Sequence, residues 1–246
     1  MNKDVFVFMM IVPYNKHIDN HEPIFERRMG MAKKLAVVVG AGKGMGVNIA
    51  KIFGQHDFKV AMLARNLEKL TPLAEELKNL GIEAYPYEAD ASSTDSLTAA
   101  FQKIRQEHGA VAVLVYNAAI LTAGFPTKLT SSDLMAHYQV DVASALHCAN
   151  LVLPEQTEKG EGAILFTGGG LALYPMAEYT CISIDKAALR AMAFALSQEV
   201  KEKGVYVGVV TIMGNIAPNT HYDPADIAEK YWELYEKRED VEYVFK

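Results

Sequence analysis

The sequence VVVGAGKGMG at residues 37–46 indicates the fold class, because it joins an apolar run to a glycine-rich turn and a helical pattern. The apolar residues from Leu35 to Val39 predict a strand that is covered on both faces. At this place Gly40, Gly44 and Gly46 permit a tight turn, close approach of backbone to a pyrophosphate and close packing of helix on strand. The stretch predicts a dinucleotide-binding turn, and a structural turn with incidental glycines is the alternative.

From residue 34 onward, short β-branched runs alternate with longer helical patterns, which predicts βαβ units and an α/β fold with a parallel sheet of six to seven strands. The predicted strands cover residues 35–39, 59–64, 83–89, 111–116, 163–167 and 205–212, and residues 241–245 add an edge strand. The predicted helices run to Phe53, from a cap at Asn66 to Gly81, from a cap at Ser93 to Gly109, and over 133–153, 178–203 and 224–236.

The composition indicates one domain and limits the kinds of partner. A chain of 246 residues, half of them hydrophobic, can bury one sizeable core, so residues 31–246 are predicted to form a single domain. The net charge of −6 lacks the basic excess that nucleic-acid binding needs. Cys148 and Cys181 fit neither a disulfide framework nor a metal-ligand spacing, so we expect no metal and a reducing, cytoplasmic setting. Small molecules and copies of the chain are the expected partners.

Residues 1–30 differ from the rest of the sequence. The apolar run from Val5 to Val12 is too short to cross a membrane, which takes roughly twenty residues. Glu26-Arg27-Arg28 could be encoded by the codons GAA-AGG-AGG. That purine-rich stretch would be a ribosome-binding sequence two codons ahead of Met31. We therefore hypothesise that translation starts at Met31, which an intact mass from the native source would test. The alternative is an ordinary N-terminal extension.

The end of the second predicted strand indicates which dinucleotide is bound. An NAD-selective site usually has an acidic residue there, which holds the ribose 2′-hydroxyl. Here Ala64 occupies that place and Arg65 follows it, while Lys43 adds a second cation in the glycine turn. Two cations without a competing carboxylate suit a 2′-phosphate, so NADP(H) is the predicted cofactor. The alternative is that both are solvated surface charges.

Several motifs together resemble the short-chain dehydrogenase/reductase family. The stretch GAGKGMG resembles the family's TGxxxGxG loop, Asp90-Ala91 its adenine-contacting pair, and YNAA at 116–119 its NNAG, so the likeness runs from about Leu35 to Ile216. The resemblance implies a doubly wound Rossmann fold with helices on both faces and the nicotinamide above the carboxyl ends of the strands. The cofactor-binding residues that it implies are Gly40, Gly42, Lys43, Gly44, Met45, Gly46, Arg65, Asp90, Ala91, Asn117, Ala118, Ala119, Lys186, Gly214 and Ile216.

The sequence departs from this family at the catalytic positions. In the family a serine, a tyrosine and a lysine, assisted by an asparagine, carry the proton transfer. An alignment without gaps keeps Lys186 but places Gly169 at the serine, Ile182 at the tyrosine and Asp141 at the asparagine. Of the family's groups only the lysine is retained, and Lys186 is expected to bind ribose hydroxyls.

Tyr179 stands seven positions before Lys186, which on a helix returns both side chains to nearly the same face, about 10 Å apart. This spacing resembles that of enoyl-ACP reductases, a divergent branch of the family. We therefore predict Tyr179 as the catalytic acid, with Ser183 as a second hydroxyl and Asp141 as a further candidate. The alternatives are that Tyr179 packs beneath the cofactor and that Ser183 bonds its own backbone.

Two readings of the function follow. The first is an NADP(H)-dependent oxidoreductase that reduces a carbonyl or a conjugated enone or enoyl substrate. The second is a non-catalytic NADP(H)-binding protein that acts as a sensor or assembly module. The apolar surface of the helices at 133–153 and 178–203, which pair across a two-fold axis in the family, predicts a homodimer, with a tetramer less assured. No membrane and no nucleic acid is expected as a partner.

Overall fold

Seven parallel strands form one sheet in the structure, a computed structural model that describes residues 32–246. They are β1 (Leu35–Val39), β2 (Lys59–Ala64), β3 (Ala84–Glu88), β4 (Val111–Tyr116), β5 (Gly162–Gly169), β6 (Val205–Ile212) and β7 (Glu242–Phe245). Their order is β3-β2-β1-β4-β5-β6-β7. The order of the strands therefore reverses between β1 and β4. In an open α/β sheet, ligands bind in the crevice at this switch point.

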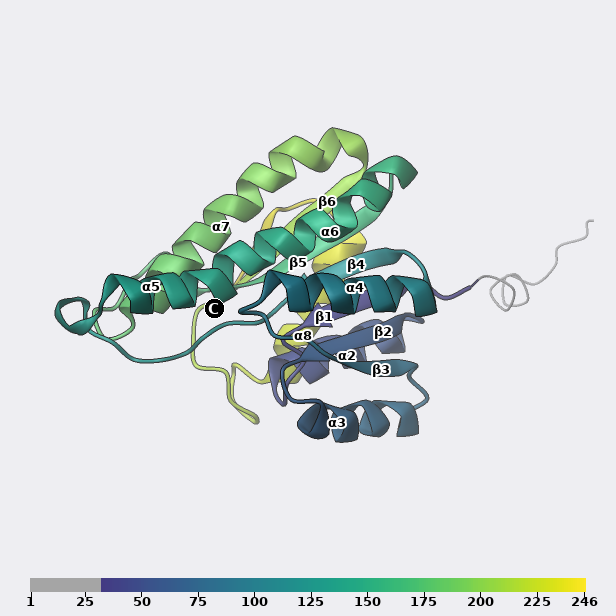
Figure 1. Cartoon of the computed structure of the whole chain (residues 1–246), viewed down its shortest axis with the longest axis horizontal. Coiled ribbons are helices and arrows are strands. Elements are labelled where there is room, and N and C mark those ends of the chain that lie inside the picture. Colours follow the sequence, from purple (N-terminus) through teal and green to yellow (C-terminus); the bar gives the residue numbers. More distant parts are fainter. Residues whose placement is uncertain (1–31) are drawn as a thin grey trace, which may run out of the picture. The chain divides into compact units, whose positions relative to one another are not determined.

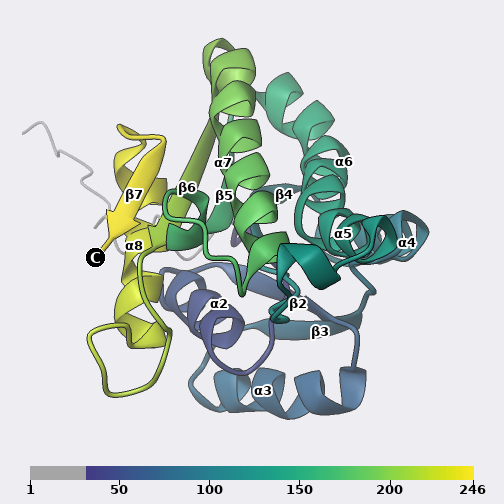
Figure 2. The same cartoon turned by 90° about the vertical axis from the view of Figure 1, so that its left-hand side faces the viewer.

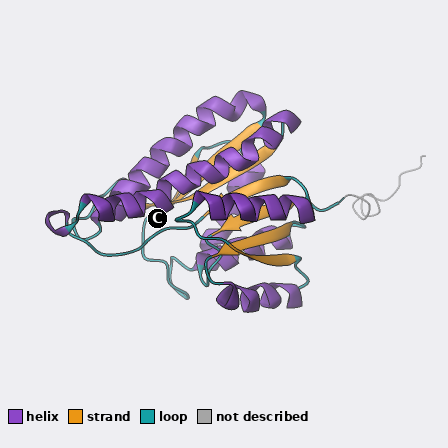
Figure 3. Ribbon diagram, in the orientation of Figure 1, coloured by secondary structure: helices purple, strands orange, loops and turns teal. Residues whose placement is uncertain are grey.

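Helices cover both faces of the sheet, as Figures 1 and 3 show. The α-helices are α2 (Met45–Gln55), α3 (Leu67–Asn79), α4 (Thr94–His108), α5 (Ser131–Tyr138), α6 (Ser144–Lys159), α7 (Thr180–Val200) and α8 (Pro224–Lys237). One buried cluster joins the sheet to α4, α6 and α7, and a second joins its other face to α2, α3 and α8. In the view of Figure 2, α6 and α7 lie together on one side and α2 lies on the other. This arrangement confirms the predicted doubly wound fold.

Local signals in the sequence account for most element boundaries. The Asn66 side chain accepts a hydrogen bond from the Lys69 amide, and Ser93 caps α4 in the same way through the Ser96 amide. The strands predicted at 35–39, 59–64, 111–116 and 205–212 agree with the structure residue for residue. The apolar patterning of a doubly covered sheet is therefore sufficient to locate its central strands.

Two predicted helices differ from the structure. The single helix predicted at 133–153 is instead α5, a π-helical segment η2 (Gln139–Ala143) and α6. Helix α7 begins at Thr180 rather than 178, and a 3₁₀ turn (Lys201–Lys203) follows it. Tyr179 has φ −121° and ψ 47°, so it precedes the helix as its N-terminal cap residue. A π-helical turn widens the backbone locally and depends on side-chain contacts, which apolar periodicity does not reveal.

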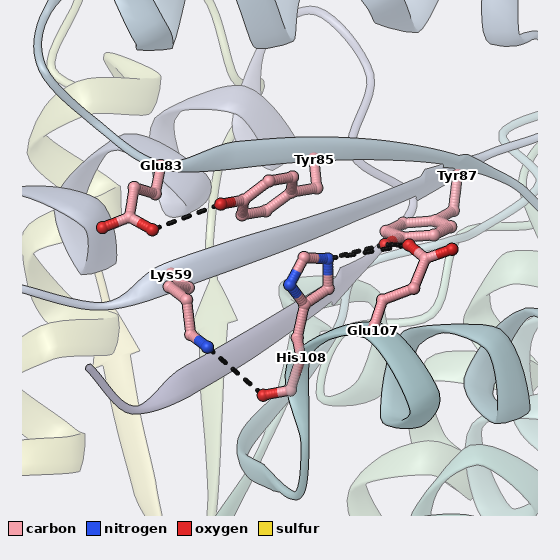
Figure 4. Close-up of polar contacts among 6 residues, drawn as sticks. All are labelled: Lys59, Glu83, Tyr85, Tyr87, Glu107 and His108. Atoms are coloured by element: carbon pink, nitrogen blue, oxygen red, sulfur yellow. Dashed lines mark hydrogen bonds and ion pairs between the residues drawn. The ribbon is translucent and has the colours of Figure 1, made fainter. Parts of the chain in front are cut away.

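The edge strand β3 is attached to α4 through a cluster of aromatic and charged groups, which Figure 4 shows. The Tyr87 hydroxyl lies 2.5 Å from a carboxylate oxygen of Glu107 and 2.7 Å from Nε2 of His108. The Tyr85 ring lies against the His108 ring, at a centroid distance of 4.1 Å. Lys59 on β2 donates to the His108 carbonyl at the end of α4. The cluster therefore fixes the last turn of α4 against the outer strands.

The predictions for residues 1–30, including a start at Met31, lie outside the described residues. Within residues 32–246, every helix is too short or too polar to cross a membrane.

Candidate active site

A cleft of about 1200 Å³ lies at the carboxyl ends of the strands. Nearly all residues predicted to bind the cofactor line it: Gly40, Gly42, Lys43, Gly44, Met45, Arg65, Asp90, Ala91, Asn117, Ala118, Ala119, Lys186, Gly214 and Ile216. Gly46 is the exception, because it is buried behind the turn where α2 crosses β1. The structure thus brings together residues from the loops after β1 to β6 in the crevice that this fold uses for ligands.

The glycine turn requires glycine for two different reasons. Gly40 has φ +84°, and a Cβ there would lie 2.5 Å from the Ala118 amide nitrogen, so the turn after β1 touches the loop after β4. A Cβ on Gly46 would lie 2.3 Å from the Gly40 carbonyl oxygen, so α2 lies directly on the turn. By contrast, a Cβ on Gly42 or Gly44 would meet no atom within 4 Å. Gly40 and Gly46 build the turn, whereas Gly42 and Gly44 leave its outer surface open, and Gly44 also needs glycine for its φ of +109°.

The start of α2 is suited to an anion. Its first amide groups have no partner inside the helix, and Gly44 at the cap position offers no side chain to occupy them. Lys43 and Arg65 are exposed at the same end of the cleft, and within residues 32–246 neither forms an ion pair. Hydrogen bonding from Ser92, aided by the charge of Arg65, lowers the pKa of Asp90. This end of the cleft therefore offers backbone donors and two cations to phosphate groups.

A buried hydrogen-bond network connects the turn to the middle of the cleft. Asn117 donates from its amide nitrogen to the Gly40 carbonyl, and its amide oxygen accepts from the Thr167 hydroxyl. That hydroxyl also lies 2.7 Å from the Tyr231 hydroxyl. Lys186 donates to the Thr167 carbonyl at 2.6 Å. The network fixes the ends of β4 and β5 relative to the glycine turn, so Asn117 has a structural partner as well as a place on the cleft wall.

Three residues at the start of α7 form one stripe on the cleft wall. Tyr179, Ile182 and Lys186 all line the cleft, at spacings of three and four that lie on one helical face. Lys186 is 6% exposed, whereas Tyr179 is half-buried. Gly169 also lines the cleft, and a Cβ there would lie 3.5 Å from Cγ of Lys186. The structure brings Tyr179 and Lys186 to one cavity, with an apolar side chain and a glycine where the family has hydroxyls.

The predicted role of Ser183 as a second catalytic hydroxyl is corrected by the structure. Ser183 does not line the cleft, because it lies one residue past Ile182 and so faces a neighbouring side of α7. Its hydroxyl donates to the Tyr179 carbonyl and accepts from the Met176 amide. These bonds stabilise the turn that precedes α7. They correspond to the alternative stated above, in which the serine bonds its own backbone.

Asp141, predicted as a further catalytic candidate, is buried and does not line the cleft. It is 0% exposed, lies in the π-helical segment η2, and accepts a hydrogen bond from the Ile120 amide at 2.8 Å. Burial raises its pKa to about 6, against the opposing effect of the Lys186 charge. Asp185, which the sequence did not single out, is also 0% exposed, and burial together with the Asp141 charge raises its pKa to about 7.

The sequence also missed Tyr174, a second phenol on the cleft. It lies in the loop after β5, lines the cleft and is 70% exposed. The only signal that could have found it is its position after the carboxyl end of a strand, where ligand-binding residues of this fold gather. Thr167 was missed because it reads as the last residue of a buried strand.

Fold and cleft together define a doubly wound α/β protein with a dinucleotide-type crevice at its switch point. The chain belongs to the short-chain dehydrogenase family, because the family model described as short chain dehydrogenase matches residues 34–222. This match confirms the resemblance that the motifs indicated, over most of the described residues.

Relatives of known name and structure agree with this assignment. The chain is 30% identical over 203 residues to 17-beta-hydroxysteroid dehydrogenase type 3 of Mus musculus, covering 80% of this chain and 64% of that protein. It is 29% identical over 182 residues to the acetoacetyl-CoA reductase of Cupriavidus necator, covering 74% of each. The crystal structure of a metagenomic short-chain oxidoreductase in complex with NADP superposes with a TM-score of 0.78 at 25% identity, covering 86% of this chain and 94% of that one.

Proposed function

We propose that this protein is an NADP(H)-dependent oxidoreductase that reduces a carbonyl or a conjugated enone or enoyl substrate. The observation that carries the proposal is that Tyr179 and Lys186 line the same cleft as the glycine turn and the two cations Lys43 and Arg65. A group for proton transfer and a site for a phosphate-bearing cofactor therefore share one cavity. The NADP-bound relative and the reductases among the named relatives support it.

The cleft fits NADP(H) on observations of its own. The open outer surface at Gly42 and Gly44 and the first two amide groups of α2, at Met45 and Gly46, suit a pyrophosphate. At the end of β2, Lys43 and Arg65 would hold the 2′-phosphate, and Ala64 offers no carboxylate to repel it. Lys186 would hold the ribose hydroxyls next to the nicotinamide. When bound, NADPH supplies the hydride.

Within this proposal, Tyr179 donates the proton to the substrate oxygen. It precedes α7 as its cap residue and lines the cleft three positions before Ile182, so its hydroxyl would reach the substrate from a different point than the family's tyrosine. The backbone of Tyr179 is held by an isolated parallel bridge to Gly124, which limits movement of this phenol. General-acid transfer by a positioned phenol accelerates reactions roughly 10²–10⁴-fold.

The cleft mouth favours a substrate with an apolar body. Leu121, Met176 and Ile216 line the cleft and are 77%, 51% and 38% exposed. After β6 the chain enters α8 within a dozen residues, so only a short segment covers this side. An open, apolar mouth suits a long or bulky substrate, whereas a small polar one would find few partners there.

The second candidate is an NADP(H)-binding protein without turnover. Ile182 and Gly169 favour it, because they remove the two hydroxyls with which the family moves its proton. The phosphate-binding end would be unaffected by these replacements. We further propose a homodimer through α5, α6 and α7, and a cytoplasmic setting, which the two buried thiols Cys148 and Cys181 favour.

Turnover separates the two candidates. NADPH oxidation would be followed with panels of ketones, aldehydes, quinones and enoyl thioesters that carry apolar groups of increasing length. The oxidoreductase proposal expects saturable oxidation with at least one class, which is lost in Lys186→Ala. Tight NADPH binding without oxidation in any class would favour the non-catalytic protein.

A further inference from the structure

Two carboxyl groups near Lys186 are buried and do not line the cleft. Asp141 in η2 and Asp185 in α7 are both 0% exposed, and these two elements pack on each other. One oxygen of Asp141 accepts from the Ile120 amide. Its other oxygen and both oxygens of Asp185 have no hydrogen-bond partner within residues 32–246. Buried carboxylate oxygens normally have partners, so these three need an explanation.

Within residues 32–246, the cation near these carboxyl groups is Lys186, which is buried and donates to the Thr167 carbonyl. Burial lowers the pKa of Lys186, whereas the charges of Asp141 and Asp185 oppose that shift. His137 on α5 places Nδ1 4.0 Å from a carboxylate oxygen of Asp185, while its Nε2 lies 2.8 Å from the Thr122 hydroxyl. Other titratable groups nearby are Cys181, whose thiol pKa is raised by burial, and Asp133, which is exposed and bonded to Thr130. On β4, burial also raises the pKa of the Tyr116 phenol, which donates to the Val140 carbonyl.

Counting the charges shows that the cluster is one proton short of neutrality. Ionised Asp141 and Asp185 with a protonated Lys186 leave one net negative charge in the interior. An uncompensated buried charge is costly, and two neighbouring carboxylates resist ionising together. One added proton removes both penalties. Burial raises the pKa of both carboxyl groups, and at Asp185 the charge of Asp141 raises it further.

We infer that Asp141 and Asp185 together carry a single proton, here called the shared proton, and that this pair couples the charge environment of Lys186 to proton binding in the interior. Thr122 is exposed and bonded to the largely buried His137, which offers a polar connection from solvent toward Asp185. Asp185 is thereby a positioning residue, which acts on the cofactor through Lys186. This second step rests on the proposed function; the shared proton itself does not.

The pair has a consequence for cofactor binding that depends on oxidation state. An oxidised nicotinamide carries a positive charge and would lie beside Lys186, which favours ionisation of both carboxyls. NADP⁺ binding near neutral pH should therefore release part of the shared proton. NADPH, which has a neutral ring and the same 2′-phosphate, should release much less. The difference in proton release between the two ligands reports the effect of the ring charge alone, because the titration of the 2′-phosphate is common to both.

Infrared titration of the full chain without ligand tests the shared proton directly. The carbonyl stretch of a protonated carboxyl should appear in the wild type and disappear as the pH rises between about 5 and 8. Asp185→Asn and Asp141→Asn should each abolish it, since the remaining carboxylate is balanced by Lys186. Glu199→Gln, which removes an exposed acid from the C-terminal end of the same helix, should retain it. A wild type without such a signal would overturn the inference, whether or not either variant folds.

Calorimetry in buffers of different ionisation enthalpy tests the coupling. Wild type and Glu199→Gln should release more protons on binding NADP⁺ than on binding NADPH, and Asp185→Asn should show no such difference. Equal proton release by both ligands in the wild type would overturn the coupling. If neither ligand binds, the proposed function fails, while the infrared titration still decides the shared proton.

Discussion

Tyr179, Ile182 and Lys186 lie on one stripe of the α7 region, and their order along the cleft determines what each can contact. Lys186 and Ile182 are both buried, Lys186 bonds to the end of β5, and Tyr179 is the most exposed of the three. A phenol moved by one turn can still reach a substrate oxygen if the substrate enters from the open side. The reaction would then place its proton donor at the cleft mouth.

Tyr179→Phe is expected to slow the chemical step by roughly a hundredfold or more, because it removes the general acid and leaves the ring in place. NADPH affinity should stay nearly unchanged, whereas Lys186→Ala should reduce both affinity and rate. Single-turnover kinetics with a substrate from the panel would measure the step. Tyr174→Phe is the matched control, since the exposed Tyr174 is the other phenol that lines the cleft. Full turnover in Tyr179→Phe, with loss in Tyr174→Phe, would move the acid to Tyr174.

Arg65→Ala is expected to weaken NADPH binding by about 1–3 kcal/mol, the range for a charge-assisted contact to phosphate. NADH binding should be unaffected, because that ligand lacks the 2′-phosphate. Calorimetric titrations with both nucleotides would measure the two effects. Lys69→Ala removes an exposed cation near the start of α3 that lies outside the cleft, and should change neither affinity. An equal loss for NADPH and NADH would refute the assignment of Arg65.

At the scale of elements, the attachment of α4 to the sheet edge makes stability depend on pH. Burial, aided by the Lys59 charge, lowers the pKa of His108 below its ordinary 6.5. The unfolded chain therefore protonates His108 more readily than the folded chain does. The contribution of neutral His108 to the free energy of unfolding is fully present above about pH 6.5, and it is lost as the pH falls below that value. The packing of His108 with Tyr85 and Tyr87 in Figure 4 is the structural cause.

Urea unfolding at a series of pH values measures this contribution. The wild type should lose stability on acidification from pH about 7 to 5.5 more steeply than His108→Gln. His221→Gln replaces a histidine that is exposed in the loop before α8, and should retain the wild-type slope. Parallel slopes for the wild type and His108→Gln would contradict the interpretation.

The elements also show what the sequence could and could not predict. Apolar runs, glycines and caps predict the sheet, the glycine turn and part of the cleft lining, because these depend on local chemistry repeated along the chain. The π-helical segment that buries Asp141 depends on a contact with Ile120. The start of α7 at Thr180 depends on the bridge between Tyr179 and Gly124. The error at Ser183 came from extending helical geometry to a residue on the adjacent face. Such tertiary contacts have no signature in a single sequence.

At the scale of the whole molecule, α5, α6 and α7 form a layer that exposes Met135, Leu146 and Ile184, at 63%, 41% and 42%. Exposed apolar residues on neighbouring helices suit a self-complementary interface between two copies. Light scattering at micromolar concentration should give a dimer for the wild type and a monomer for Leu146→Lys. Leu67→Lys, at a similarly exposed leucine on the other face of the sheet, should remain a dimer. A monomeric wild type would contradict the prediction.

The central claim is that the crevice between the β1 and β4 loops holds NADP(H) in preference to NAD(H), and calorimetric titration of the wild-type protein with NADPH and NADH tests it most directly. The glycine turn, the amide groups of α2 and the cations Lys43 and Arg65 predict one NADPH site per chain and a weaker affinity for NADH. Equal affinities for the two nucleotides would contradict the assigned preference. No detectable binding of either nucleotide would contradict the account of the cleft itself.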